Sequence, residues 1–506
     1  MAQSDTTQMS ARRIIAAFSE GSVTPSAFLE SCLGRISALN PQVNALTAFD
    51  TERAVVEAAQ ATYRWKEGTP KGMLDGLPIG VKDLQDTAGL LTTHGSPRAL
   101  GNIPKADLPM VARLRAEGAI VLAKTNVPEL GAGGNTRNPV WGATGNPFDP
   151  SLVAGGSSGG SAAALAADLL PLCTGSDTGG SLRLPAGLCG IVGYRPSVDV
   201  IAHPTRPVGW SAISVLGPMA RDVDDLILML RASHGYDAGD PLSCPSDRSR
   251  FDALPDTPLS SLRLGVSEDF GGAPVDPDIR ATFRARVATL APHVAECRGV
   301  DLNLGEMDRA FDILRAESFL AGFGEAARTN PDDFGSHIHR NVELGWTMTL
   351  ADRAWAHMEQ TRILRRFNSR IEGLDAILVP TSPVSPFPWT EHYPASIDGT
   401  EMDIYYRWLA LTYRGSMSGG PVISLPVGRD GAGMPFGLQM LGPVRGDVGL
   451  LAAARSVEEF FAQDPQTARP RPDTDALQSS GIDLRSIVTH PPLANSADGP
   501  EMTTAV

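Results

Sequence analysis

The chain has 506 residues, of which 42% are hydrophobic and 20% charged, a composition typical of a globular protein with a large core. Its formal net charge of -14 argues against nucleic acid or an anionic membrane as the main binding partner. Five cysteines without metal or disulfide spacing indicate a reducing cytoplasm, and the lack of a long apolar run predicts neither a membrane span nor a signal peptide.

The first part of the chain carries helical patterns. Apolar residues recur at helical spacing over Ser10–Ser19, Pro25–Leu39 and Thr51–Trp65. Thr24 stands before Pro25, and a threonine N-cap followed by proline is typical of a helix start. The sequence therefore predicts three helices here.

Two short apolar segments that each end in a lysine come next. Leu77–Val81 leads to Lys82, and Ala119–Ala123 leads to Lys124. A helical pattern over Leu108–Glu117 lies between them. This strand–helix–strand order predicts a largely parallel sheet with helices on its faces. Sites in such sheets lie beyond the carboxyl ends of the strands, where we expect both lysines.

Two glycine–serine loops follow, after a stretch over Asn126–Pro150 whose composition predicts a long ordered loop. The loops are Gly155–Ser161 and Asp177–Ser181, and they flank a small-residue helix and a short apolar strand. Glycine clusters let the backbone turn sharply and approach a ligand closely. The serines in these loops are therefore candidate nucleophiles.

The second half of the chain alternates between amphipathic helices and buried strands. Helices are predicted over Asp222–Leu230, Asp276–Ala291, Gly305–Arg328, Leu350–Ile371 and Val448–Phe461. Strands are predicted over Leu262–Val266, Asp375–Pro380, Val422–Val427 and Pro435–Leu441, the last two joined by a turn at Arg429–Gly433. From about Gln463 the sequence is polar and nonperiodic, which predicts a tail that wraps the surface or is partly disordered.

A serine nucleophile needs an adjacent base, and the sequence limits the candidates. No histidine lies between His94 and His203. The chain has only five lysines, and a desolvated lysine can act as a base whereas an arginine cannot. From the residues alone, Lys82 and Lys124 are equal candidates, and each is as readily a structural residue.

Other catalytic motifs fit less well. Gly155–Gly159 matches the G-x-S-x-G elbow of α/β-hydrolases, but we expect the preceding Asn146–Ser151 to be loop rather than strand. No lysine follows the glycines as a phosphate loop requires. His337 and His339 lack a metal-ligand cluster and are expected on a surface loop beside a helix. Core packing explains five aromatic residues better than a pocket does: Trp346, Trp355, Tyr405, Tyr406 and Trp408.

The glycine–serine region and its flanks resemble the amidase signature family. The matching segments are Gly76–Asp83, Lys124–Glu129, Gly155–Ser161, Gly175–Ala186, Gly217–Arg221, Pro380–Pro383, Pro421–Pro426 and Gly437–Gln439, in the family's order. The resemblance covers about residues 10–465 and is most specific around 76–195.

This resemblance implies an α/β architecture, the amidase signature fold, in which a large twisted mixed β-sheet of about eleven strands is covered by helices on both faces. It also implies one domain over residues 1–465 and a polar C-terminal tail over 466–506. Within the domain we expect N-terminal helices at about 10–66, a catalytic core at about 70–235, a variable substrate region at about 235–420, and a closing hairpin and helix at about 420–462.

The resemblance also implies a Ser–cis-Ser–Lys triad. Its motifs place the nucleophile at Ser181, the bridging serine at Ser157 and the base at Lys82, so that Lys124 becomes structural. The Gly156–Ser157 peptide bond is expected to be cis, with Ser157 turned toward Lys82 and Ser181 while Ser158 faces away.

Neighbouring backbone and side chains receive roles from the same resemblance. The oxyanion and substrate-binding positions are Gly131, Thr178, Gly179 and Gly180, with Ser181 adding its own amide. Asp177 and Arg183 are expected to support the loop. Where the family commonly has Gly-Leu-Lys-Pro, this chain has Gly193-Tyr194-Arg195-Pro196, which leaves the packing beside the loop open.

The implied function is that of an amidase, an enzyme that hydrolyses a carboxylic amide C–N bond through an acyl-enzyme without a metal or organic cofactor. The alternatives are a carbamate or ester hydrolase with the same triad, a glutamine-hydrolysing amidotransferase subunit, and a non-catalytic glycine-loop binding protein. The expected partner is a small-molecule amide, with no nucleic acid and no membrane, in the cytoplasm; a homodimer is left open.

Overall fold

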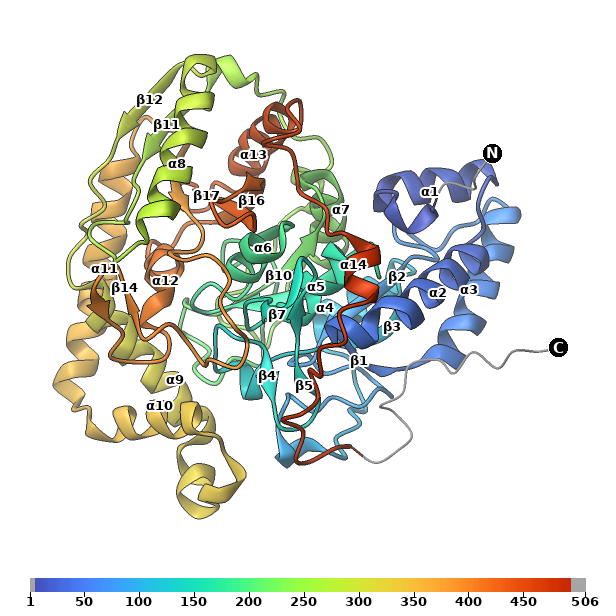
Figure 1. Ribbon diagram of the computed structural model, residues 1–506, viewed down its shortest axis with the longest axis horizontal. Helices are drawn as coiled ribbons and strands as arrows, with labels where there is room; N and C mark the ends of the chain where they lie inside the picture. The colour runs from blue at the N-terminus through green and yellow to red at the C-terminus, as the bar shows by residue number, and fades with distance from the viewer. Residues whose placement is uncertain (1–4, 493–506) are drawn as a thin grey trace.

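An eleven-stranded mixed β-sheet lies at the centre of the computed structural model, which describes residues 5–492 (Figure 1). The strand order is β1-β3-β2-β8-β10-β9-β16-β17-β13-β11-β12. The strands are β1 (Leu46–Phe49), β2 (Pro78–Lys82), β3 (Ile120–Thr125), β8 (Leu172–Asp177), β9 (Val192–Arg195), β10 (Val215–Ala220), β11 (Arg263–Val266), β12 (Glu296–Gly299), β13 (Ala376–Pro380), β16 (Val422–Arg429) and β17 (Pro435–Leu441). The prediction of a large mixed sheet of about eleven strands is confirmed.

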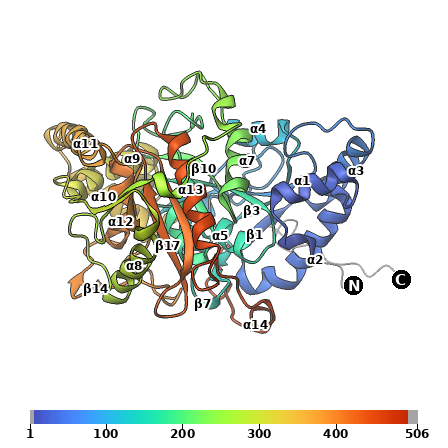
Figure 2. The same ribbon diagram turned by 90° about the horizontal axis from the view of Figure 1, so that it is seen from above.

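Helices flank the sheet, with α1–α3 at one end of the molecule and α9–α11 at the other (Figure 2). The α-helices of the described residues are α1 (Ala11–Glu20), α2 (Pro25–Val43), α3 (Thr51–Lys66), α4 (Pro109–Ala116), α5 (Gly159–Ala166), α6 (Arg183–Cys189), α7 (Val223–Ser233), α8 (Pro277–Leu290), α9 (Met307–Thr329), α10 (Ser336–Thr347), α11 (Leu350–Ile371), α12 (Ala410–Met417), α13 (Asp447–Phe461) and α14 (Thr474–Gln478). Short 3-10 helices are η1 (Thr6–Gln8), η2 (Pro97–Ala99), η3 (Glu129–Gly131), η4 (Arg248–Phe251), η5 (Leu259–Ser261), η6 (Ala291–His293), η7 (Pro331–Asp333) and η8 (Arg407–Leu409). None of the helices in residues 5–492 has the length and hydropathy needed to cross a lipid bilayer.

Two apolar cores lie on opposite faces of the sheet. Successive residues of a strand point to opposite faces, and β8 and β10 divide their side chains accordingly. Leu172 and Ala220 belong to the core that contains α7, whereas Cys173 and Met219 belong to the core that contains α5 and α2. Both faces of the central strands are therefore buried, as their continuous apolar sequences require.

Three neighbouring parallel strands bring the candidate site residues to one edge of the sheet. β2 pairs in parallel with both β3 and β8. Their carboxyl ends carry Lys82, Lys124 with Thr125, and Asp177, respectively. The predicted edge for a site is thus the edge at which these residues meet.

The region before the first glycine–serine loop contains more regular structure than its composition predicts. Four short strands interrupt the expected loop: β4 (Arg137–Asn138), β5 (Gly142–Ala143), β6 (Gly145–Asn146) and β7 (Asp149–Val153). The expectation that residues 146–151 are loop is therefore wrong, because β7 pairs with β6 and ends shortly before Ser157. This pair lies outside the main sheet, so it does not supply the central strand on which a hydrolase elbow is built. A further two-stranded sheet, β14 (Ser396–Ile397) with β15 (Thr400–Glu401), lies in the chain between β13 and α12.

The polar tail after α13 wraps the surface as far as residue 492. It passes α2 through α14 and reaches β5, where the Ala143 amide donates to the Leu484 carbonyl at 2.8 Å (Figure 1). Leu477 and Leu484 are buried along this path. The part of the predicted tail over residues 493–506 lies outside the described residues.

Helix α5 packs so closely against the segments around Ala45 and Asn126 that larger residues do not fit. Its residues are glycine, serine, alanine and leucine, and all are buried. A Cβ at Gly160 would lie 2.2 Å from the Asn126 backbone nitrogen and 2.6 Å from the Ala45 carbonyl oxygen. Glycine is required here because backbone atoms of two other segments occupy the place of a side chain.

Gly160→Ala should therefore destabilise the protein by about 1–3 kcal/mol, because the added methyl group displaces backbone rather than a flexible side chain. Gly34→Ala is the matched control, since Gly34 is an exposed position within α2 with no atom near its missing Cβ. That control should stabilise by about 0.5–1 kcal/mol. Urea unfolding midpoints measure both effects, and equal midpoints for the two variants would contradict the prediction.

Candidate active site

Lys82 is buried at the end of β2 with its amine surrounded by hydroxyl groups. Its Nζ donates to Ser157 Oγ at 2.8 Å, to Ser158 Oγ at 2.7 Å and to Ser176 Oγ at 3.0 Å. Its backbone amide donates to Thr174 Oγ1 on the neighbouring strand β8 at 2.9 Å. Lys82 is thus held at its backbone amide and at its side-chain amine. Within residues 5–492, the amine forms no ion pair with a carboxylate.

Burial makes this amine a base near neutral pH. It lowers the pKa of Lys82 from its ordinary value to about 7, although the negative charge of Asp177 acts in the opposite direction. A lysine with this pKa is partly unprotonated at pH 7. It can therefore accept a proton from the serine hydroxyl to which it is bonded.

The Gly156–Ser157 peptide bond is cis, as the resemblance implies. Ser157 is buried and its hydroxyl meets Lys82. The expectation that Ser158 faces away is wrong, because its hydroxyl lies as close to the Lys82 amine as that of Ser157. Two adjacent serines therefore share one amine, and only Ser157 also borders the cavity described below.

Ser181 stands on the loop after β8, where unpaired backbone amides surround it. Within residues 5–492, no acceptor takes the amide hydrogens of Thr178, Gly179 or Ser181. The Gly180 amide is different, because it donates to Asp177 Oδ1 at 2.9 Å. The donors left for a substrate oxygen are thus three of the four amides that the resemblance proposes.

Asp177 holds this loop through two buried arginines. Arg183 donates to its carboxylate from Nε at 3.1 Å and from Nη2 at 3.0 Å. Arg195 donates from Nη1 to the Asp177 carbonyl at 2.7 Å and also contacts Oδ1 at 3.3 Å. Burial alone would raise the pKa of Asp177, but the two guanidinium charges outweigh it and hold the pKa well below its usual range.

Lys124 lies on the adjacent strand and serves the backbone instead. Its Nζ donates to the Gln85 carbonyl and, at 2.8 Å, to Thr87 Oγ1. Burial lowers the pKa of Lys124 to about 8, with Asp83 opposing the shift. Because this amine meets neither glycine–serine loop, its contacts are those of a structural residue.

A cavity of about 490 Å³ lies in front of the two serines. Ser157 and Ser181 both border it, together with Gly131, whose φ of +75° and closeness to Leu84 exclude a side chain. The Gly131 amide donates to the Pro128 carbonyl at 2.9 Å. Apolar residues form much of the remaining wall: Leu84, Leu108, Leu130, Leu216, Phe319 and Phe323.

Two histidines also border this cavity but are not placed as bases for its serines. His203 Nδ1 lies 3.3 Å from Thr205 Oγ1, and His94 lies 3.8 Å from the Asp86 carboxylate. In the described part of the chain, neither ring is hydrogen-bonded to Ser157 or Ser181. Lys82 is therefore the basic group in contact with a cavity serine.

A family model described as Amidase matches residues 27–451. The chain belongs to the amidase signature family. It is 34% identical over 493 residues to a glutamyl-tRNA(Gln) amidotransferase subunit of Salinispora arenicola, covering 90% of this chain and 97% of that protein. Members of the family act on C–N bonds, so the chain is similar to enzymes of that class.

Solved structures of the family have the same fold. A bacterial aryl acylamidase superposes with a TM-score of 0.84 at 26% identity, covering 94% of this chain and 99% of that chain. The 6-aminohexanoate cyclic dimer hydrolase superposes with a TM-score of 0.81 at 26% identity, covering 92% and 99%.

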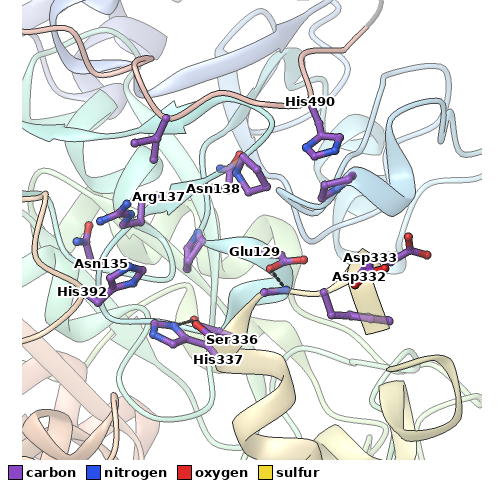
Figure 3. Close-up of a pocket in the computed structure, with 17 residues that line it drawn as sticks. Glu129, Asn135, Arg137, Asn138, Asp332, Asp333, Ser336, His337, His392 and His490 are labelled. Carbon is purple, nitrogen blue, oxygen red and sulfur yellow. Dashed lines mark hydrogen bonds between the residues drawn. The ribbon is translucent and has the colours of Figure 1, made fainter. Parts of the chain in front are cut away.

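A second cavity, of about 330 Å³, is bordered by Glu129 and Ala132, which flank Gly131 in the chain (Figure 3). His337 from α10 and His490 from the tail lie across it from each other, and neither Ser157 nor Ser181 borders it. His337 Nδ1 is bonded to the Ala132 carbonyl at 2.9 Å. Within residues 5–492, no group of three or more His, Cys, Asp or Glu side chains is arranged to hold a metal ion.

The structure corrects the expected place of several residues. His337 and His339 belong to helix α10 rather than to a loop, and His337 is largely enclosed between Ala132 and Tyr405. Tyr405, Tyr406 and Trp408 are buried in the core, as expected, but Trp346 is 58% exposed. None of the five aromatic residues borders the cavity of Ser181.

Sequence reasoning gave no role in the site to four polar residues around it: Ser158, Ser176, Arg195 and Arg315. Ser158 and Ser176 lie within the quoted motifs, and Arg195 lies at the position where the chain departs from the family pattern, which marked that position for inspection. Arg315 lies in an amphipathic helix far along the chain, where no local pattern distinguishes it.

A fluorophosphonate probe should attach to Ser181, because this serine borders the cavity next to free amides and the Lys82–Ser157 pair. The rate should fall roughly tenfold per pH unit below about 7, since protonated Lys82 cannot accept a proton. Mass spectrometry of the labelled peptide and labelling rates between pH 5 and 9 measure this. Attachment to Ser157 or Ser158, or a rate that does not change with pH, would contradict the assignment.

Proposed function

We propose that the protein hydrolyses a carboxamide C–N bond through an acyl-enzyme on Ser181. One observation carries this proposal: a buried amine, Lys82, with a pKa of about 7 is bonded to Ser157, which shares a cavity with Ser181. A general base, a relay hydroxyl and a nucleophile at one place are the components that amide cleavage by serine requires.

The first half of the reaction forms the acyl-enzyme. Ser181 Oγ attacks the carbonyl carbon while its proton passes to Ser157, whose own proton goes to Lys82. The carbonyl oxygen becomes an oxyanion and accepts hydrogen bonds from the amides of Thr178, Gly179 or Ser181. Each such donor contributes about 3–4 kcal/mol to stabilising the transition state.

The second half releases both products. Lys82 returns its proton through Ser157 to the leaving nitrogen, and the C–N bond breaks as the amine departs. Water then gives a proton through Ser157 to Lys82 as it attacks the acyl carbon; the bond from the acyl carbon to Ser181 Oγ breaks, Ser181 Oγ takes the proton back through Ser157, and the carboxylic acid leaves. The same atoms would cleave a carbamate or an ester, so a substrate panel separates these alternatives.

A second candidate is a protein that hydrolyses glutamine as part of an amidotransferase. The relative from Salinispora arenicola is named as a subunit of glutamyl-tRNA(Gln) amidotransferase, and this supports the amidotransferase alternative better than a stand-alone amidase. Such a protein would release ammonia to its partners. The similarity to an aryl acylamidase and to a cyclic dimer hydrolase supports hydrolysis by the chain alone.

Ser181→Ala and Lys82→Met should each lower kcat/KM by at least about 10³-fold, because each removes a group from the proton relay. Lys124→Met is the matched control, a second buried lysine on the neighbouring strand, and it should lose less than about tenfold per folded molecule. Product release from glutamine, aliphatic amides, acyl anilides and carbamates is measured for each variant after thermal unfolding has verified its fold.

Full activity in Ser181→Ala would exclude the proposed nucleophile, and full activity in Lys82→Met would exclude the proposed base. Hydrolysis of anilides or aliphatic amides by the isolated chain supports a stand-alone amidase. Hydrolysis of glutamine alone, together with copurifying protein partners, supports the amidotransferase alternative.

A further inference from the structure

Arg315 brings a positive charge into the wall of the active-site cavity. It lies on α9 and borders the same cavity as Ser157 and Ser181. Only 7% of the residue is exposed, and Phe319 and Phe323 of the same helix line the wall beside it. A guanidinium group in such a position has lost most of its water.

No carboxylate in residues 5–492 forms an ion pair with this guanidinium group. Its Nη2 donates to Tyr405 Oη at 2.6 Å, while its buried Nε has no hydrogen-bond partner. The other arginines of this region are paired: Arg309 with Asp352, Arg407 with Asp312, and Arg414 with Asp308. Arg315 therefore differs from these arginines, because no neighbouring carboxylate neutralises its positive charge.

Aromatic rings hold the guanidinium group in one orientation. Its central carbon lies 4.7 Å from the ring centroid of Phe319 and 4.9 Å from that of Tyr406. Tyr405, which accepts its hydrogen bond, is fixed in turn by Asn341 Nδ2 at 2.7 Å and by the stacked ring of His337 at 3.9 Å. The charge is thus held in place before any ligand binds, which lowers the entropic cost of recognition.

We propose that Arg315 binds a carboxylate group of the substrate and so selects amides that carry one. The inference rests on the proposed amide hydrolysis. A buried guanidinium group needs an acceptor, and its planar donors match a carboxylate. Asp86 is the acidic residue among those that line this cavity; its side chain is about half exposed and lies beside His94, so it does not neutralise Arg315.

Paired substrates test this selection. The monoamides succinamate, glutaramate and adipamate carry a carboxylate, and their diamides are neutral compounds of the same shape. N-acetylglycine and N-acetylglycinamide form the corresponding pair with the carboxylate on the amine side. The wild-type enzyme should favour the carboxylate member of at least one pair by about 10- to 100-fold in kcat/KM.

Arg315→Gln should bring that ratio close to one because it lowers kcat/KM for the carboxylate member far more than for the neutral member, and Arg315→Lys should retain part of the preference. Arg309→Gln is the matched control, because Arg309 lies on the same helix but is exposed and outside the cavity. An unchanged preference in Arg315→Gln, or no preference in the wild-type enzyme, would overturn the inference.

A binding measurement separates this inference from the proposed reaction. Calorimetry with Ser181→Ala protein should detect succinate, glutarate, adipate or N-acetylglycine, and adding Arg315→Gln should weaken the tightest of these by about 10- to 100-fold. Equal affinities with and without Arg315, or no binding of any of them, overturn the role of Arg315. Binding that depends on Arg315 without any hydrolysis by the wild-type enzyme would overturn the proposed reaction alone.

Discussion

The chemistry of this protein depends on the burial of one amine. Lys82 ends a strand that lies between two parallel neighbours, so its side chain enters a region without water. Serine hydroxyls surround the amine and satisfy its hydrogen bonds, yet they bring no charge that would hold its proton. An arginine at the same position would stay protonated, which explains why a chain rich in arginine retains lysine here.

Asp177 connects Lys82 to the proposed oxyanion loop over residues 178–181. Its carboxylate is close enough to raise the pKa of Lys82, and it also accepts the Gly180 and Leu182 amides that shape the loop. Two guanidinium groups, from Arg183 and Arg195, form ion pairs with that carboxylate. Their positive charges hold the pKa of Asp177 low, so its carboxylate stays ionised and anchors the loop, while burial lowers the pKa of Lys82 to about 7.

Much of the site could be predicted from sequence because its residues lie at strand ends and in glycine-rich loops. Periodicity identified the strands that end near Lys82 and Lys124, but it could not choose between the two lysines; the family motifs did. Periodicity did not identify β9 and β10, because these strands are short and lie in sequence rich in Gly and Pro. It also did not identify helix α10. Arg315 could not be found this way, since its significance depends on Tyr405 and on the lack of an acid, both of which are set by tertiary packing.

The fold separates the reacting groups from the wall that faces the substrate. The reacting groups come from strand ends and their loops, whereas Arg315 and Phe319 come from α9. The two parts meet where Phe311 of α9 and Thr412 of α12 pack against Gly179 and Gly180, and a side chain at either glycine would collide with them. Helix α9 can thus carry different side chains toward the cavity while its packed residues keep the oxyanion loop in place. A substitution on the cavity side of α9 would therefore leave Lys82, Ser157 and Ser181 in place.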